Sequence, residues 1–130
     1  MTDLKQFEKQ EFVSLETFRK SGVAVRTPIW FAREGDKFYL WTYGNSGKVK
    51  RIRNNARVNI APCTRSGEIT GEWMAASAAV DDSEAAVQHV VSLLRAKLGF
   101  GFNFFKAIEG LIEMLRGQRR AAISVSFSEN

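Results

Sequence analysis

Short segments rich in aromatic and β-branched residues, separated by glycine-containing turns, fill residues 11–80 of this 130-residue chain. These residue types favour β-strands, and closely spaced strands joined by glycine turns are typical of a small barrel. The pattern therefore predicts a mainly β-protein. The expected strands are residues 11–19, 23–32, 37–43, 57–63, 74–80 and 121–127.

Two amphipathic helices are expected between the last two strands, because apolar residues recur there every three or four positions. The aromatic run at residues 100–105 fits the core or an interface, and a lid beside a planar ligand is the alternative. The first helix is expected to start at a cap on Asp81 or Asp82 and to end at Gly99, and the second starts at Phe104 and ends at Gly117.

Pro28 lies in the middle of the second expected strand and has no N–H to give to a neighbouring strand. The strand is therefore expected to be unpaired on one side near its middle. A sheet that opens at this point leaves a slot. A simple edge strand is the alternative explanation of Pro28.

A basic stretch follows the third expected strand. Residues 43–58 contain five cationic side chains and no acidic one. A turn with Ser46 and Gly47 that opens a short helix presents backbone N–H groups without intrahelical partners, at the positive end of the helix dipole. Lys48 and Arg51 lie three positions apart, so both can reach one phosphate. The stretch predicts an anion site, and a solvated surface helix is the alternative.

Composition narrows the function further. A chain of 130 residues with 45% hydrophobic and 25% charged residues is expected to form one globular domain, and its net charge of +5 favours an anionic partner. Cys63 and His89 are the only cysteine and histidine, so neither a disulfide nor a metal site is expected, and His89 is expected to be solvated or hydrogen-bonded rather than catalytic. Without a membrane-spanning run or the apolar core of a signal peptide, we expect a cytoplasmic protein.

Three segments, residues 25–31, 38–42 and 46–58, together resemble the pyridoxamine 5′-phosphate oxidase-like superfamily. The match is closest to its branch of deazaflavin (coenzyme F-420)-dependent oxidoreductases, and it covers residues 8–80 well and the last strand loosely. The resemblance implies a six-stranded antiparallel split β-barrel that forms a homodimer, with coenzyme F-420 or FMN in a groove between the subunits. The two helices after the fifth strand depart from the vitamin oxidase itself, so vitamin oxidation is not carried over.

The resemblance also implies which residues hold the cofactor. Arg26 stands at the place of a phosphate-binding arginine, at the start of a strand that runs beneath the flavin ring. The loop before the fifth strand reaches the cofactor of the partner subunit in this superfamily, which nominates Glu72 and Trp73. The residues expected to bind the cofactor are Arg26, Thr27, Pro28, Ile29, Trp30, Trp41, Thr42, Ser46, Gly47, Lys48, Arg51 and Trp73.

The expected function is an oxidoreductase that moves a hydride between a reduced deazaflavin, or FMN, and a small unsaturated or quinone-like acceptor. The sequence offers no serine–histidine–acid set and no carboxylate pair for acid–base or covalent catalysis, so the chemistry is expected to reside in the cofactor. One alternative is a non-catalytic flavin- or deazaflavin-binding protein. Another is a barrel that binds single-stranded nucleic acid, with aromatic residues such as Trp30, Trp41 and Tyr43 beside the basic stretch.

Overall fold

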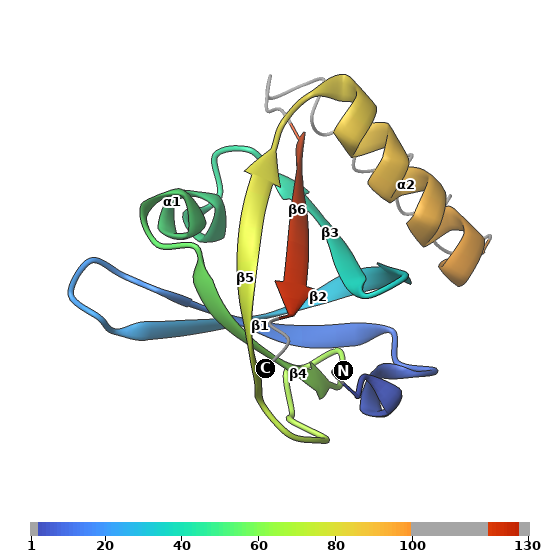
Figure 1. Ribbon diagram of the computed structural model, residues 1–130, viewed down its shortest axis with the longest axis horizontal. Coiled ribbons are helices and arrows are strands. Elements are labelled where there is room, and N and C mark those ends of the chain that lie inside the picture. Colours follow the sequence, from blue (N-terminus) through green and yellow to red (C-terminus); the bar gives the residue numbers. More distant parts are fainter. Residues whose placement is uncertain (1–2, 100–119, 128–130) are drawn as a thin grey trace.

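The computed structural model describes residues 3–99 and 120–127. Figure 1 shows a β-barrel with a short helix at one end and a longer helix along one side. The expected strands are all present, and their bounds match the sequence pattern to within two residues. The elements are η1 (Lys5–Phe7), β1 (Phe12–Phe18), β2 (Ala24–Glu34), β3 (Lys37–Tyr43), α1 (Gly47–Asn54), β4 (Arg57–Cys63), β5 (Met74–Asp81), α2 (Glu84–Leu98) and β6 (Arg120–Phe127).

The six strands form one closed antiparallel barrel in the order β1-β2-β3-β6-β5-β4. Three pairs of consecutive strands, β1–β2, β2–β3 and β4–β5, are neighbours in the barrel. Helix α1 lies between β3 and β4, which are not neighbours, and the last strand β6 pairs with both β3 and β5. The barrel closes where β1 pairs with β4, with Leu15 opposite Ile60. The barrel expected from the strand spacing is therefore confirmed.

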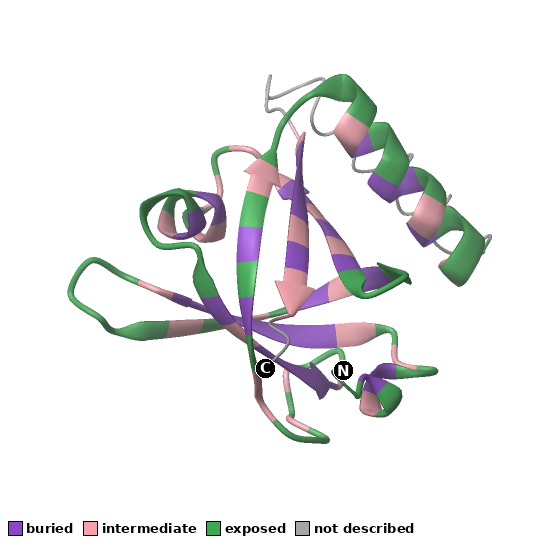
Figure 2. Ribbon diagram, in the orientation of Figure 1, coloured by how far each residue is buried: buried purple, intermediate pink, exposed green. Residues whose placement is uncertain are grey.

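Side chains alternate between the barrel interior and its outer face, as the two-residue period of a strand requires. Figure 2 shows this alternation most clearly on β5, where Ala76 and Ala78 are buried and their neighbours are exposed. The interior is filled by apolar side chains from all six strands. The largest completely buried ones are Phe31, Phe38, Leu15, Leu40, Ile60 and Ile123 in the barrel and Leu94 in α2.

Helix α2 packs on the outside of the barrel and contacts β2, β3 and β6. Its buried residues Val87, Val90, Val91 and Leu94 form a second apolar cluster with Ala32 and Ala122. The expected cap at Asp81 or Asp82 is wrong, because Ser83 caps the helix and its side chain accepts a hydrogen bond from Ala86 N at 3.2 Å. Asp81 remains in β5, where it pairs with Ala122. Gly99 follows the helix at a φ of 69°, as expected of a C-terminal glycine.

Strands β2 and β3 pair over only part of their length. Phe31 to Glu34 are opposite Leu40 to Lys37, whereas the part of β2 that contains Pro28 pairs with β1 alone. Pro28 therefore lies where β2 has no β3 partner, as the missing N–H predicts. The two strands separate beside this residue, and the slot that we expected lies there.

Two expectations concern residues outside the described part of the chain, namely the aromatic run at 100–105 and the helix from Phe104 to Gly117. Among the described residues, no helix combines the length and the apolar character needed to cross a membrane.

Candidate functional site

A cavity of about 360 Å³ lies where β2 and β3 separate. This volume is within the range of pockets that hold small molecules. The described side chains around it are largely aromatic or aliphatic, with one cation. They are Phe12, Pro28, Ile29, Trp30, Trp41, Arg65 and Leu94, so the structure brings four of the expected site residues, Pro28, Ile29, Trp30 and Trp41, to one cavity. We call this the split cavity.

The walls of the split cavity are held by contacts between strands. Phe12 is opposite Trp30 in the β1–β2 pair, and their rings stack with centroids 5.8 Å apart and an interplanar angle of 29°. The guanidinium of Arg65 lies 5.8 Å from the Phe12 ring centroid. A flat aromatic wall with one cation at its edge suits a planar, electron-rich ring.

The turn before α1 has the expected form. Ser46 is the N-cap, and its hydroxyl accepts a hydrogen bond from Val49 N at 3.4 Å. Lys48 is half-buried, and its pKa is lowered by burial and by the neighbouring charge of Arg51. The two cations therefore lie close together beside the capped turn, which is the arrangement that an anion stabilises.

Arg51 is fixed in place by its neighbours. Its Nε donates a hydrogen bond to the Thr17 hydroxyl at 2.6 Å, and Thr17 is only 1% exposed. A Cβ atom on Gly47 would lie 2.6 Å from Nη1 of Arg51, so the guanidinium rests in the space that a side chain at position 47 would need. Burial and the charge of Arg19 lower the pKa of Arg51. Thr17 and the space left by Gly47 thus fix the guanidinium of Arg51 beside the start of α1.

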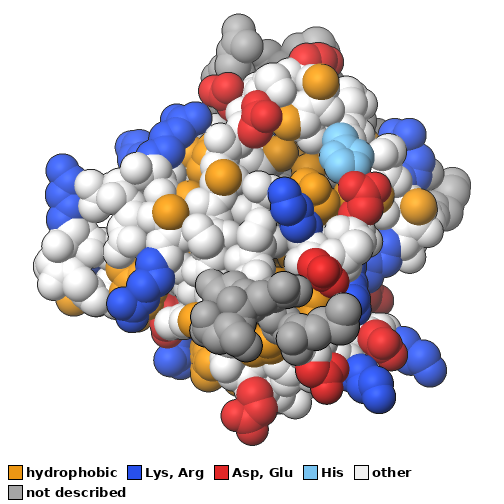
Figure 3. Space-filling view, viewed as in Figure 1, with side chains coloured by type: hydrophobic (Ala, Val, Ile, Leu, Met, Phe, Trp, Pro, Cys, Tyr) orange, Lys and Arg blue, Asp and Glu red, His pale blue; other side chains and the backbone are white. Residues whose placement is uncertain are grey.

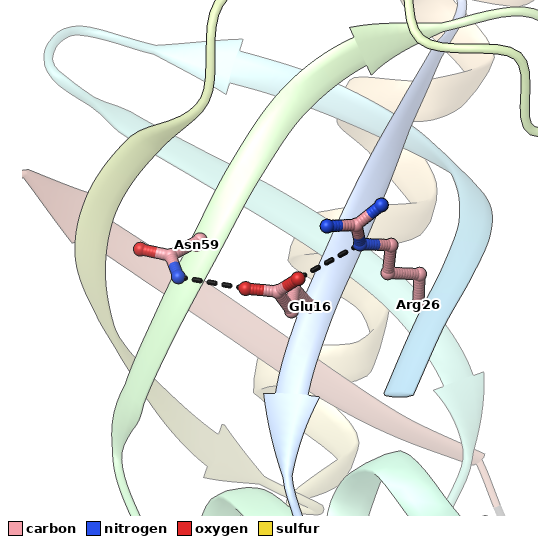
Figure 4. Close-up of polar contacts among 3 residues, drawn as sticks. All are labelled: Glu16, Arg26 and Asn59. Carbon is pink, nitrogen blue, oxygen red and sulfur yellow. Dashed lines mark hydrogen bonds and ion pairs between the residues drawn. The ribbon is translucent and has the colours of Figure 1, made fainter. Parts of the chain in front are cut away.

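Arg26 lies on the outer face of β2, in the polar cluster of Figure 4. Its Nε donates to Glu16 Oε2 at 2.8 Å, and Glu16 Oε1 accepts a second bond from Asn59 Nδ2 at 2.8 Å. The guanidinium also lies 4.6 Å from the ring centroid of Trp73. The Arg26 side chain is 59% exposed, so it can still meet an anion through its other nitrogens.

Burial would raise the pKa of Glu16, because it disfavours the charged carboxylate. The hydrogen bonds from Asn59 and Arg26, together with the charges of Arg26 and Arg57, outweigh that effect and leave the pKa below its usual value. Glu16 is therefore an ionised group at neutral pH that positions Arg26.

Three expected residues lie elsewhere. Thr27 and Thr42 are on the interior-facing sides of their strands, and neither is among the described residues that line the split cavity. Glu72 bonds through its backbone to the Gln6 side chain, with Glu72 N donating to Oε1 at 2.8 Å and its carbonyl accepting from Nε2 at 2.9 Å. The structure thus separates these residues from the aromatic wall.

Sequence reasoning missed several residues beside the site. Phe12 was findable, because aligning the first hairpin across its turn places it opposite Trp30. Arg65 and Leu94 reach the split cavity from a loop and from α2, and no sequence pattern placed them there. Arg53, one of the basic stretch, pairs with Asp82 at 3.6 Å, on a different side of α1 from Arg51.

Within residues 3–99 and 120–127, no group of three or more His, Cys, Asp or Glu side chains is arranged to hold a metal ion. Arg65 is the one titratable side chain among the described residues that line the split cavity. The described wall thus offers binding and orientation rather than proton transfer.

No family profile and no curated protein matches this sequence. Solved structures do match. HutZ, described as the heme storage protein of Vibrio cholerae, has 13% identity and a TM-score of 0.67 over 97% of this chain and 87% of its own. A protein described as a putative pyridoxamine 5′-phosphate oxidase from Listeria innocua has 12% identity and a TM-score of 0.59, covering 97% and 90%. An F-420 reductase has 12% identity and a TM-score of 0.62, covering 99% and 97%.

These neighbours share the split-barrel fold of pyridoxamine 5′-phosphate oxidase-like proteins, and the chain described here has that fold too. The fold expected from the resemblance is therefore confirmed. At identities of 12–13% the likeness concerns the fold alone.

Proposed function

We propose that this protein binds a deazaflavin (coenzyme F-420) or FMN and acts as an oxidoreductase on a small unsaturated or quinone-like acceptor. The observation that carries the proposal is the split cavity, an aromatic slot of about 360 Å³ at the place where β3 leaves β2 unpaired. A capped turn with two cations lies at the start of α1. A planar ring with a phosphate-bearing tail requires an apolar surface for the ring and a separate anion-binding turn for the phosphate.

Each part of the site has a role in this proposal. The ring packs against Pro28, Trp30 and Trp41, which exclude water from one of its faces. Ser46, Lys48 and Arg51 hold the phosphate, and Arg26 contributes a further cation beside Trp73. The bound cofactor supplies the hydride chemistry at its central ring. The protein contributes orientation, and its cations complement the anionic tail.

The names of two structural neighbours agree with this proposal, since one is an F-420 reductase and another a putative pyridoxamine 5′-phosphate oxidase. The proposal includes a homodimer with the cofactor at the subunit interface. The outer face of β5 offers room for a second copy, because Ala75, Ser77 and Ala79 are small and exposed. Sedimentation of the purified protein at micromolar concentration tests this part, and a monomer under all conditions would contradict it.

A non-catalytic cofactor-binding protein is the second candidate. The observation that favours it is the wall of the split cavity, where Arg65 is the one titratable side chain among the described residues. HutZ, with the same fold, is described as a storage protein. Such a protein would use the same residues to bind, and it would leave the cofactor unchanged.

Turnover distinguishes the two candidates. Chemically reduced deazaflavin and reduced FMN are mixed with the protein and a small quinone without oxygen, and the absorbance of the oxidised cofactor is followed. We expect the protein to accelerate oxidation of one cofactor, and to lose this effect when Trp30 and Trp41 are both replaced by Ala in a variant that still folds. Saturable binding without acceleration for a panel of quinones and enones would support the storage protein instead.

A further inference from the structure

A second hollow lies between the tip of the β1–β2 hairpin and α1. It has a volume of about 280 Å³ and is lined by Phe18, Arg19, Lys20, Gly47, Lys50, Arg51 and Asn54. Figure 1 shows the hairpin extending away from the barrel on the side where α1 lies. We call this feature the tip hollow. None of its described lining residues also lines the split cavity.

The tip hollow concentrates positive charge. Four of its lining residues, Arg19, Lys20, Lys50 and Arg51, are cationic, and none of the described lining residues is acidic. A fifth cation, Arg57, lies with its guanidinium 5.1 Å from the Phe18 ring centroid. Figure 3 shows Lys and Arg side chains over this side of the molecule, where Figure 1 places the hairpin and α1. Like charges this close repel one another unless an anion lies between them.

One of these cations, Arg51, is held in place, whereas Arg19, Lys20 and Lys50 are exposed. Arg19 and Arg51 both line the hollow, and burial together with the charge of Arg19 lowers the pKa of Arg51. The buried Thr17 hydroxyl fixes Arg51 Nε at 2.6 Å, and the absence of a side chain on Gly47 lets the guanidinium lie against the first turn of α1. A guanidinium that is already oriented loses less entropy when it binds an anion.

The position of the tip hollow separates it from the split cavity. Six residue steps along β2 separate Ala24, beside the hairpin tip, from Trp30, which corresponds to about 20 Å of extended strand. A ring packed against Trp30 therefore does not fill the tip hollow. The tip hollow is therefore distinct from the split cavity, although one of its lining residues, Arg51, is also assigned to the cofactor's phosphate in the proposed function.

We propose that the tip hollow binds a multiply charged oxyanion, either a group with more than one phosphate or a polycarboxylate, through Arg19, Lys20, Lys50 and Arg51. The number of cations exceeds what one phosphate needs, which favours a ligand with several negative charges. The volume of about 280 Å³ matches a compact anionic group and is small for a nucleic-acid strand. This binding does not depend on a redox cofactor and can be measured without one.

The test is calorimetric titration of the purified protein with inorganic pyrophosphate and with citrate at low salt. We expect saturable binding of at least one of them, and the tighter ligand identifies the anion as phosphate or carboxylate. Replacing Lys20 or Lys50 by Ala should weaken binding by about fivefold, the effect of one exposed charge pair. Arg53→Ala is the matched control, because Arg53 is a cation of the same helix that pairs with Asp82. Its affinity should change less than twofold.

Gly47→Ala tests the geometry without changing the charge. The new methyl group must displace Arg51 Nη1, and the change is not expected to destabilise α1, because Ala is a better helix former than Gly. We expect weaker binding with an unchanged or higher melting temperature. Wild-type binding in this variant would overturn the proposed role of Arg51.

The proposal is overturned if neither anion binds saturably, or if Arg53→Ala weakens binding as much as Lys20→Ala does. The second result would also mean that the charge acts as a diffuse field, such as a single-stranded oligonucleotide senses. Failure here is distinct from failure of the proposed function. If FMN or the deazaflavin binds and neither anion does, only the proposal for the tip hollow is contradicted. If an anion binds and neither cofactor does, only the redox proposal is contradicted.

Discussion

Arg26 and Glu16 form an ion pair across the first hairpin, with Arg26 Nε 2.8 Å from Glu16 Oε2. The two residues are opposite each other in the antiparallel register of β1 and β2. The carboxylate is 10% exposed and also accepts a bond from Asn59 on β4. One buried acid therefore ties three strands together and orients the arginine that we propose for the cofactor site.

Replacing Glu16 by Ala should lower the free energy of unfolding by about 1–3 kcal/mol, because Asn59 and Arg26 lose their shared acceptor. Chemical denaturation followed by circular dichroism measures the change. Glu8→Ala is the control, since Glu8 is exposed and should shift stability by less than about 0.5 kcal/mol. Equal stability of both variants would show that the three-strand contact contributes nothing.

The same contact predicts that the stability of the protein depends on pH in the acidic range. The pKa of Glu16 is lowered in the folded state, so the unfolded state binds the proton more tightly. The stabilisation is present above the usual glutamate pKa and is lost as the pH falls through the lowered folded value. Denaturation curves between pH 7 and pH 3 should show a shallower loss of stability in Glu16→Gln than in the wild type. Parallel curves would contradict this assignment.

Lys97 predicts a rise of stability with pH in the alkaline range as well. Its Nζ donates to the Phe31 carbonyl at 2.7 Å and lies 3.5 Å from the Phe31 ring centroid, and burial lowers its pKa to about 8. The unfolded state therefore binds the proton more tightly between this value and the usual lysine pKa, so stability rises with pH in that window. Lys97→Met should show a smaller rise between pH 7.5 and 10 than the control Lys9→Met. An identical rise in both would remove Lys97 as the cause.

Lys48→Glu should weaken cofactor binding without unfolding the protein. Loss of a charge-assisted contact and gain of a repulsion should cost about 2 kcal/mol or more in binding. The fold should survive, because a carboxylate at position 48 lies near Arg51, whose charge acts on Lys48 in the wild type. Melting temperature and the cofactor dissociation constant are measured together, and an unchanged dissociation constant would remove Lys48 from the site.

Local patterns in the sequence predict most of this fold. The residue types of β3 and β4 act over a few positions, so these strands have the expected bounds, residues 37–43 and 57–63. The missing N–H of Pro28 is also a local property, and the barrel opens beside this residue. The predicted cap of α2 is wrong because a contact with a distant strand overrides a local preference. Asp81 is a good cap, but its pairing with Ala122 on β6 keeps it in the sheet and leaves Ser83 as the cap.

The candidate site is less predictable, because it depends on contacts between distant segments. Ser46, Gly47 and Lys48 form a local turn, and the sequence identifies it. Arg19 and Lys20 become part of a basic hollow only because the barrel brings the first hairpin to α1. Thr42 shares the interior-facing side of β3 with Phe38 and Leu40, and the sequence of β3 has aromatic or apolar residues on both sides, so it does not tell which side is buried.

The central claim is that the split cavity holds the ring of a flavin or deazaflavin. Trp30 and Trp41 line this cavity, so a bound ring should quench their fluorescence. The most direct measurement is titration of the protein with coenzyme F-420 and with FMN at low and high salt, followed by tryptophan fluorescence. We predict saturable quenching with one cofactor per chain, tighter for the deazaflavin, whose longer anionic tail should also give the steeper salt dependence. Absence of saturable quenching by either cofactor would contradict the claim.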